Sequence, residues 1–255
     1  MDDIRAIIFD IDGVLEYQGR VYPGAIEVVN SLRERGMILR FLTNSTLKSR
    51  ASCSDKLKKA GFSVSDEEVF TASFITAMYL RELNPRSIWV MVEREGLDEF
   101  EDFLRDEENP EYLVIGDNRS RFDFEHLNRA LRMLKRGAKL IGMQPELIDS
   151  GMGELELNVG SWVGMLERAA GIEATYIGKP SRFAFEMPLK TLDLERNQVL
   201  VVGDRVATDI KGAKAIGMHC VLIRTGEFRE QELDGSVEPD FAFDSIQEVL
   251  SLFVV

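Results

Sequence analysis

Short apolar runs alternate along the chain with stretches whose apolar residues recur at helical spacing, and polar turns separate the two patterns. The first run, Ile4-Arg5-Ala6-Ile7-Ile8-Phe9, ends in Asp10-Ile11-Asp12-Gly13. A run of this length is too short for a buried helix and is typical of a parallel strand that is buried on both faces. The segment 25–34 then carries its apolar residues on one helical face and is followed by Gly36, which predicts a helix and its end.

The same two patterns continue to the end of the chain. Strands are predicted over 37–42, 87–92, 112–116, 139–142, 175–177, 199–202, 218–223 and 241–243. Helices are predicted from the turn after 45 to about 60, and over 73–83, 123–135, 160–170, 183–192, 208–215 and 246–252. Between them we expect a polar link over 16–22, a solvated helix face over 93–111, where ten acidic residues gather, and a loop over 144–158 with a short strand at 154–157. The alternation of strands and helices predicts an α/β fold with a doubly wound parallel sheet.

Composition narrows the class of protein. The chain has 255 residues, 45% of them apolar, and a net charge of −13. No basic stripe offsets that charge, which argues against a nucleic-acid partner or an anionic membrane surface. No apolar stretch is long enough to span a bilayer, and the first residues lack the basic and apolar pattern of a signal peptide. With two cysteines, too few for a disulfide framework, we expect a cytoplasmic protein.

Asp10 and Asp12 stand where the first strand is expected to open into a polar crevice. Residues i and i+2 of a strand project to the same side, so the two carboxylates are expected to converge. Like charges held that close are costly unless a cation lies between them or one carboxylate is protonated. The pair therefore indicates a divalent metal, a proton-transfer role or both, and the alternative is a solvated Asp-Gly turn that ends the strand.

Polar residues follow four of the predicted strands, at the positions where an open parallel sheet places its ligand. They are Asp10 with Asp12, Thr43 with Asn44, Lys179, and Asp204 with Asp209. Each group has a simpler explanation as a helix cap, an exposed cation before a proline or a turn. Those explanations leave open why all four groups fall at the carboxyl ends of strands, because unrelated turns would be spread over both ends of the sheet.

Residues of these types are the ones that phosphoryl transfer requires. A carboxylate can attack phosphorus and form an aspartyl phosphate, and a second acid can protonate the leaving alcohol and then activate water. Mg²⁺ prefers oxygen ligands, so a few carboxylates are enough to hold it. A lysine, a hydroxyl and backbone N–H groups can neutralise the phosphoryl oxygens.

The four groups resemble, in order along the chain, the four motifs of the haloacid dehalogenase superfamily of phosphatases. The matching segments are Asp10-Ile11-Asp12-Gly13-Val14, Leu42-Thr43-Asn44-Ser45, Gly178-Lys179-Pro180 and Gly203-Asp204-Arg205-Val206-Ala207-Thr208-Asp209. The α/β segment between the second and third motifs is similar to the cap of the NagD-like and 4-nitrophenylphosphatase-like branch. The resemblance implies a Rossmann-like core made of 1–82 and 178–255, with an inserted cap over 83–177.

The resemblance also implies a role for each motif residue. Asp10 would be the nucleophile and Asp12 the general acid and base. Mg²⁺ would be held by the Asp10 carboxylate, the backbone carbonyl of Asp12 and the Asp204 carboxylate, with Asp209 helping through water. The transferring phosphoryl group would be bound by Thr43, Asn44 and Lys179.

The expected function is therefore Mg²⁺-dependent hydrolysis of a small phosphorylated metabolite through phospho-Asp10. One alternative is a phosphotransferase or mutase with the same site and an acceptor other than water. Another is a non-catalytic phosphate-binding signalling module, such as a receiver domain, although that class is about half this length. A homodimer is expected only by analogy, because dimers formed through the cap occur among similar proteins.

Overall fold

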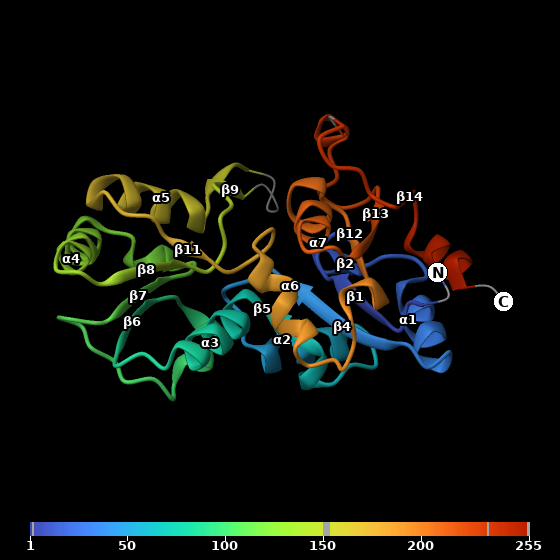
Figure 1. The fold of residues 1–255 in the computed structure, drawn as a ribbon, viewed down its shortest axis with the longest axis horizontal. Coiled ribbons are helices and arrows are strands. Elements are labelled where there is room, and N and C mark those ends of the chain that lie inside the picture. The colour runs from blue at the N-terminus through green and yellow to red at the C-terminus, as the bar shows by residue number, and fades with distance from the viewer. Residues whose placement is uncertain (2, 150–153, 234, 254–255) are drawn as a thin grey trace. The chain divides into compact units, whose positions relative to one another are not determined.

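The computed structural model describes residues 1, 3–149, 154–233 and 235–253, and it has the predicted α/β class. Contacts group the chain into two compact units (Figure 1). The first, called here the six-stranded unit, comprises 1–43, 53–70 and 179–255, and the second, the four-stranded unit, comprises 44–52 and 71–178. The boundaries expected from the family resemblance, a core of 1–82 and 178–255 and a cap of 83–177, stay a prediction.

A parallel sheet forms the centre of the six-stranded unit. Its strands lie in the order β14-β13-β12-β1-β4-β5, and each neighbouring pair from β14 to β4 is parallel. The bounds are β1 Ala6–Asp10, β4 Ile38–Thr43, β5 Val69–Thr71, β12 Val199–Gly203, β13 His219–Ile223 and β14 Phe241–Phe243. Strand β5 is the one strand of this sheet that the sequence patterns did not predict.

Strand β1 is the interior strand that the sequence pattern indicates. All five of its residues are buried, and it pairs with β12 on one side and β4 on the other. Its side chains Ile7 and Phe9 pack in one apolar cluster with Val28 and Leu32 of a covering helix. The helices assigned to this unit, wholly or in part, are α1 Ala25–Glu34, α2 Arg50–Lys59, α6 Arg182–Leu189 and α7 Lys211–Ala215.

Two segments of this unit differ from the sequence-based expectation. Instead of a polar link, 16–22 forms an antiparallel hairpin of β2 Glu16–Tyr17 and β3 Arg20–Val21. Both turn residues, Gln18 and Gly19, have positive φ angles, of 51° and 78°, which is the geometry that two-residue hairpin turns require. The predicted last helix is a 3₁₀ helix, Ile246–Phe253.

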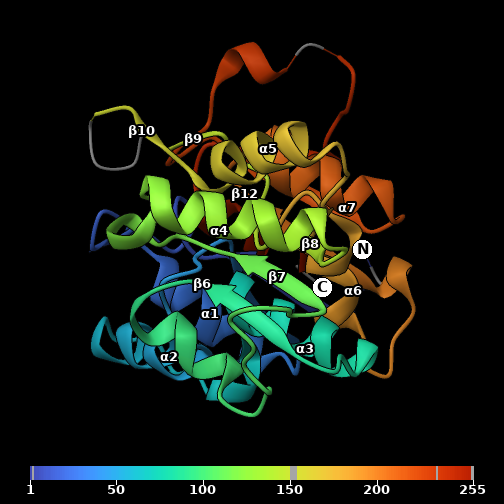
Figure 2. The ribbon, with the colours of Figure 1, turned by 90° about the vertical axis from the view of Figure 1, so that its left-hand side faces the viewer.

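A second parallel sheet, with the order β11-β8-β7-β6, forms the centre of the four-stranded unit. Its strands are β6 Ile88–Met91, β7 Tyr112–Ile115, β8 Lys139–Gly142 and β11 Thr175–Tyr176, and its helices are α3 Ala72–Leu83, α4 Phe124–Lys135 and α5 Val159–Ala170. Helices α4 and α5 pack side by side against the sheet, and Met133 and Val163 share an apolar cluster with Leu113 of β7 (Figure 2).

The acidic stretch 93–111 is solvated as expected, but the prediction of a helix face there is wrong. After a short 3₁₀ helix, Arg94–Phe100, the chain continues in bends and turns. Tertiary contacts explain the departure. Phe100 is fully buried, and Gly96 packs so closely on the backbone of Thr46 that a Cβ atom would lie 1.9 Å from its carbonyl oxygen. Local helix propensity cannot override two such anchors.

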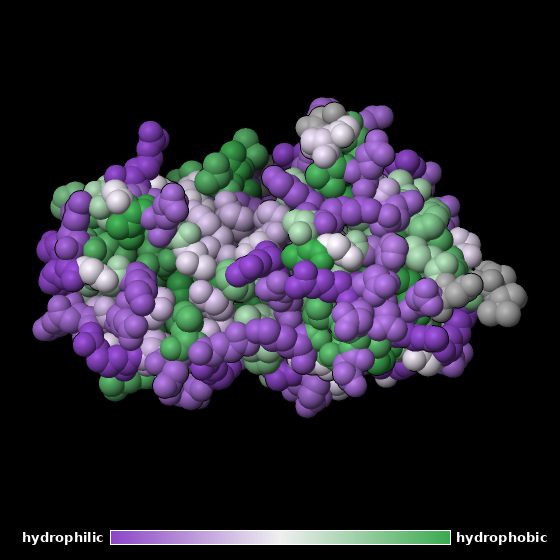
Figure 3. Space-filling view, viewed as in Figure 1, coloured by the Kyte–Doolittle hydropathy of each residue, from purple (hydrophilic) through white to green (hydrophobic). Residues whose placement is uncertain are grey.

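The loop predicted over 144–158 contains an antiparallel pair, β9 Ile148–Asp149 and β10 Glu156–Leu157. Only β10 falls in the predicted short strand, 154–157. Gly151 and Gly153 of the predicted loop lie outside the described residues. Apolar side chains lie at the surface here, as the space-filling view shows near the position of β9 (Figure 3). They are Leu147, Ile148, Leu155 and Leu157, each more than half exposed. Within the described residues, no helix has both the length and the apolar character needed to cross a membrane.

Candidate active site

The topology of the six-stranded unit brings three of the predicted motifs to one edge of its sheet. Strand β1 ends at Asp10, the neighbouring β4 ends at Thr43, and β12, on the other side, ends directly before Asp204. These three strands are parallel, so their carboxyl ends lie at the same edge. This is the edge at which open α/β sheets bind their ligands.

Three carboxylates form the centre of the site. Asp10, Asp204 and Asp209 each place an oxygen within 4.8 Å of the others, and all three are buried. Asp209 reaches the cluster from a π-helical turn, Val206–Ile210, and π-helical turns occur frequently at functional sites. Gly203 leaves room for it, because a Cβ atom at that position would lie 2.2 Å from the Cβ atom of Asp209.

Lys179 is the cation of this cluster. Its Nζ lies 2.6 Å from Asp10 Oδ1 and 2.7 Å from Asp209 Oδ1, and the residue is only 3% exposed. Burial alone would lower the pKa of Lys179, but the charges and hydrogen bonds of Asp10 and Asp209 outweigh burial and raise the pKa above its usual value. The lysine is therefore fixed in its charged form beside the carboxylate that the sequence predicts to be the nucleophile.

One lysine does not balance three carboxylates. Burial, and then the charge of Asp209, raise the pKa of Asp204 to about 7. Burial likewise raises the pKa of Asp10 well above its usual value, against the lowering effect of Lys179. The backbone N–H of Glu227 donates to Asp204 Oδ2 at 2.7 Å, whereas Asp204 Oδ1 is buried with no hydrogen-bond partner among the described residues. A divalent cation would satisfy that oxygen and the excess negative charge, so the donor set fits an ion such as Mg²⁺.

This electrostatic imbalance predicts a metal-dependent stability. Adding Mg²⁺ in place of a chelator is expected to raise the melting temperature, because the ion binds the folded cluster and has no comparable site in the unfolded chain. The folded pKa of Asp204 lies above its ordinary value, so without a cation its contribution to stability is lost as the pH rises through about 7. The metal-induced shift should consequently be larger at pH 8 than at pH 5, as measured by thermal denaturation.

The matched control for this measurement is Asp204→Asn, which replaces one charged oxygen ligand of the expected ion by a neutral amide of nearly the same volume. Its melting temperature should respond far less to Mg²⁺ than that of the unsubstituted chain. Equal responses in the two proteins would show that the ion stabilises the fold from elsewhere.

Asp12 lies in a different environment from Asp10. The strand ends before it, and the chain turns at Gly13, whose φ angle is 96°. A Cβ atom on Gly13 would lie 2.0 Å from Asp204 Oδ2, so glycine is required both for the turn and for close packing on the acid cluster. The Asp12 side chain is 54% exposed, and its Oδ2 accepts a hydrogen bond of 3.2 Å from the Thr43 hydroxyl. A buried and a solvated carboxylate two residues apart suit two separate chemical roles.

Asn44 and Arg205 each follow a motif residue at the end of a strand. Asn44 follows Thr43, is half-buried and groups by contact with the four-stranded unit. Arg205, which follows Asp204, directs its guanidinium to Glu227 and Glu232, at 3.5 and 3.6 Å. Sequence reasoning missed Glu16 and Lys56, both of which lie beside Asp12, because neither belongs to a recognisable motif.

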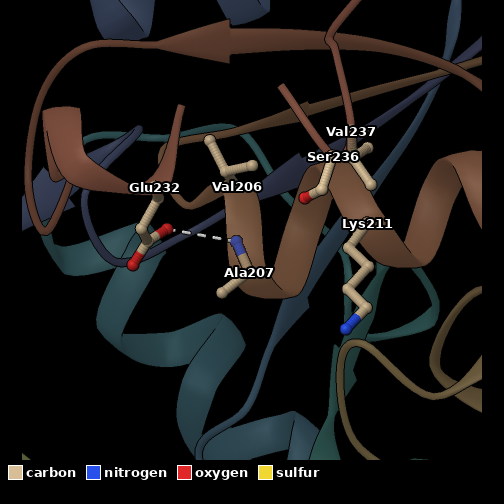
Figure 4. Close-up of a pocket in the computed structure, with 6 residues that line it drawn as sticks. All are labelled: Val206, Ala207, Lys211, Glu232, Ser236 and Val237. Carbon is tan, nitrogen blue, oxygen red and sulfur yellow. Dashed lines mark hydrogen bonds between the residues drawn. The ribbon is translucent and has the colours of Figure 1, made fainter. Parts of the chain in front are cut away.

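A pocket of about 200 Å³ opens beside the π-helical turn, and the residues that line it are drawn in Figure 4. Glu232 enters this pocket from the loop after β13, and its Oε2 accepts a hydrogen bond of 3.1 Å from the backbone N–H of Ala207. The lining residues are Val206, Ala207, Lys211, Glu232, Ser236 and Val237, none of which is a predicted site residue. The acid cluster is thus separate from this pocket, although both adjoin the same turn.

The parallel α/β sheet and the acid cluster at its strand ends occur in a chain that matches the models of a known hydrolase family. The chain belongs to this family: the model of the haloacid dehalogenase-like hydrolases matches residues 7–106, and that of the HAD-hydrolase-like proteins matches 176–249. The predicted family and fold class are confirmed.

The chain is similar over most of its length to several named proteins. It is 34% identical over 242 residues to a phospholysine phosphohistidine inorganic pyrophosphate phosphatase of Xenopus laevis, covering 90% of this chain and 86% of the relative. Among solved structures, p-nitrophenyl phosphatase from Archaeoglobus fulgidus superposes with a TM-score of 0.91 at 30% identity, covering 98% of this chain and 99% of the other. NagD from E. coli K-12 superposes with a TM-score of 0.89 at 25% identity, covering 96% and 98%.

Proposed function

We propose that this protein is a Mg²⁺-dependent phosphatase that hydrolyses small phosphorylated compounds through a phospho-aspartate on Asp10. The observation that carries the proposal is the contact of 2.6 Å between Asp10 and the buried Lys179, inside a cluster with Asp204 and Asp209. Such an arrangement holds a nucleophile, a fixed cation and a set of metal ligands at one point. The similarity to proteins named as phosphatases supports the same reaction class.

In the proposed reaction, one Asp10 carboxylate oxygen forms a bond to phosphorus while the bond from phosphorus to the ester oxygen breaks. Asp12 gives its proton to that ester oxygen, so that a neutral alcohol leaves. The Lys179 ammonium stabilises the negative charge of the transferring group, and Thr43 and Asn44 are proposed to bind its oxygens. A bound Mg²⁺, held by Asp10, Asp204, Asp209 and the Asp12 carbonyl, would supply further charge stabilisation.

Hydrolysis of the phospho-aspartate completes the cycle. Asp12, now a carboxylate, takes a proton from water as the water oxygen attacks phosphorus. The bond from phosphorus to Asp10 then breaks, which releases inorganic phosphate and restores the Asp10 carboxylate. Asp12 ends the cycle protonated and ready for the next substrate. Its exposure to solvent is consistent with this role, because both the leaving alcohol and the water must reach it.

The proposal predicts a defined activity. The purified chain should release inorganic phosphate from p-nitrophenyl phosphate in the presence of Mg²⁺ and lose this activity in excess chelator. A panel of alkyl phosphates, phospholysine, phosphohistidine and pyrophosphate should be assayed in parallel, because the names of the relatives include substrates with P–N and P–O–P bonds. The comparison of rates across the panel identifies which bond type the site prefers.

The phosphotransferase alternative is tested by the same assay. With water as acceptor, p-nitrophenolate and inorganic phosphate appear in equal amounts, whereas transfer to an added alcohol or sugar leaves phosphate in deficit. A protein that binds phosphate but releases neither product from any member of the panel would be the non-catalytic module instead.

A further inference from the structure

Lys56 lies beside the proposed acid and base but belongs to none of the motifs. It is on helix α2, and its Nζ is 3.9 Å from Asp12 Oδ1. The other oxygen of the same carboxylate, Oδ2, accepts the hydrogen bond from Thr43. Thus each oxygen of a half-exposed carboxylate faces a partner from a different part of the chain.

A buried acid fixes the position of this lysine. Lys56 Nζ donates a hydrogen bond to Glu16 Oε1, and the Glu16 side chain is only 3% exposed. Glu16 belongs to the same turn as Asp12, because its N–H donates to the Ile11 carbonyl and its own carbonyl accepts from the N–H of Gly13. The ammonium of Lys56 is therefore held at the turn that carries Asp12.

The surroundings also keep Lys56 charged. Its ammonium forms an ion pair with the buried Glu16 carboxylate and lies 3.9 Å from the Asp12 carboxylate, and both negative charges favour the charged form of the lysine. The Glu16 side chain is buried, and leaving its charge unpaired there would be costly, so the pairing with Lys56 is favoured.

We propose that Lys56, held by Glu16, is a positioning residue that orients the Asp12 carboxyl group for proton transfer to the leaving group and from water. This inference rests on the proposed phosphatase function and extends it to residues outside the four motifs. Lys56 contacts Asp12, which is not one of the residues proposed to bind the phosphoryl group, so its effect is on the proton-transfer steps and not on substrate binding. Two anchors on one carboxylate restrict its rotation, and errors of about an ångström in such geometry are costly in rate.

The test compares two esters that differ in their need for a proton donor. Nitrophenolate leaves readily without protonation, whereas an alkoxide does not, so general-acid catalysis matters chiefly for the alkyl ester. Lys56→Met should lower kcat/KM for an alkyl phosphate about tenfold more than for p-nitrophenyl phosphate, with KM for both esters nearly unchanged. Lys56→Arg keeps a cation and should recover most of the loss.

A double variant separates this role from simple stability. Lys56→Met leaves Glu16 buried without its partner, so the double variant Glu16→Gln/Lys56→Met removes both charges. If the double variant is folded by circular dichroism and still discriminates against the alkyl ester, the loss arises from the missing ammonium beside Asp12. Full recovery in the double variant would overturn the proposal, because it would trace the loss to the stranded glutamate.

Lys58→Met is the matched control on the same helix, since Lys58 pairs with Asp55 and Asp66 at the surface and should leave both rates at the level of the unsubstituted chain. Equal behaviour of Lys56→Met and Lys58→Met in an active protein would also overturn the inference. If the unsubstituted chain hydrolyses neither ester, the proposed function itself has failed. The two failures are thus distinguishable.

Discussion

Replacing Asp10 with asparagine should lower kcat on p-nitrophenyl phosphate by at least roughly 10⁴-fold, as expected for loss of a catalytic nucleophile. The carboxamide fills nearly the same volume but cannot form a stable acyl phosphate. The effect should appear in kcat with every substrate of the panel, because the phospho-aspartate must form before inorganic phosphate is released in each case. A steady-state phosphate-release assay in Mg²⁺ measures the loss.

A direct readout accompanies the kinetics. Rapid acid quench during turnover, followed by mass spectrometry, should find phosphate on the peptide that contains Asp10 in the unsubstituted chain and none in Asp10→Asn. His126→Ala is the control, since His126 contacts Asp123 at the start of helix α4 in the four-stranded unit and should leave turnover near its original value. A comparable loss in the histidine variant would mean that the site has been misplaced.

The patterns that specify β1 and its neighbours were readable from sequence because they depend on local constraints. A run of Ile and Phe cannot be half-solvated, so Ala6–Asp10 had to be an interior strand, and it is. Once strands alternate with helices, the sheet is parallel and the polar residues after each strand share one edge. The grouping of Asp10 with Lys179 and Asp204 followed from that rule together with the family resemblance.

What the sequence did not specify depends on contacts between distant segments. The convergence expected for Asp10 and Asp12 assumed an unbroken strand, but β1 ends at Asp10 and the next residues turn. Asp12 consequently lies half-exposed against Thr43 and Lys56, outside the buried acid cluster. The turn is set by the packing of Gly13 on Asp204, almost two hundred positions away in the chain, which no local pattern encodes.

The conformation of the acidic stretch 93–111 and the contact of Lys56 with Asp12 also depend on distant segments of the chain. A charge run predicts solvation reliably, but whether it is helical was decided by the burial of Phe100 and the close approach of Gly96 to Thr46. Lys56 was one of several lysines on helix α2, and nothing in its spacing distinguishes it from Lys58 or Lys59. Only the fold shows that Lys56 pairs with a buried glutamate, whereas Lys58 pairs with acids at the surface.

Replacing Lys179 with methionine should cost both activity and stability. Methionine matches the length of the lysine stem but removes the charge that Asp10 and Asp209 share at 2.6 and 2.7 Å. Removing one partner of a buried ion pair typically destabilises a protein by about 3–5 kcal/mol, because the remaining charge stays buried and uncompensated. Here two carboxylates lose their partner, beside a third, Asp204, whose pKa is already raised to about 7.

The pH dependence of this loss distinguishes charge from packing. Without Lys179 the carboxyl groups of the cluster are expected to titrate still further above their unfolded values, so their protonated forms stabilise the fold at low pH and that stability is lost as the pH rises. In chelator, the decrease in unfolding free energy of Lys179→Met should therefore be larger at pH 8 than at pH 5, as measured by urea denaturation. Lys214→Met, which removes a partly exposed ion pair with Asp240, should cost no more than about 1 kcal/mol at either pH. A loss in Lys179→Met that does not vary with pH would indicate that lysine serves there as a packing element, and the acid cluster would then need its cation from another source.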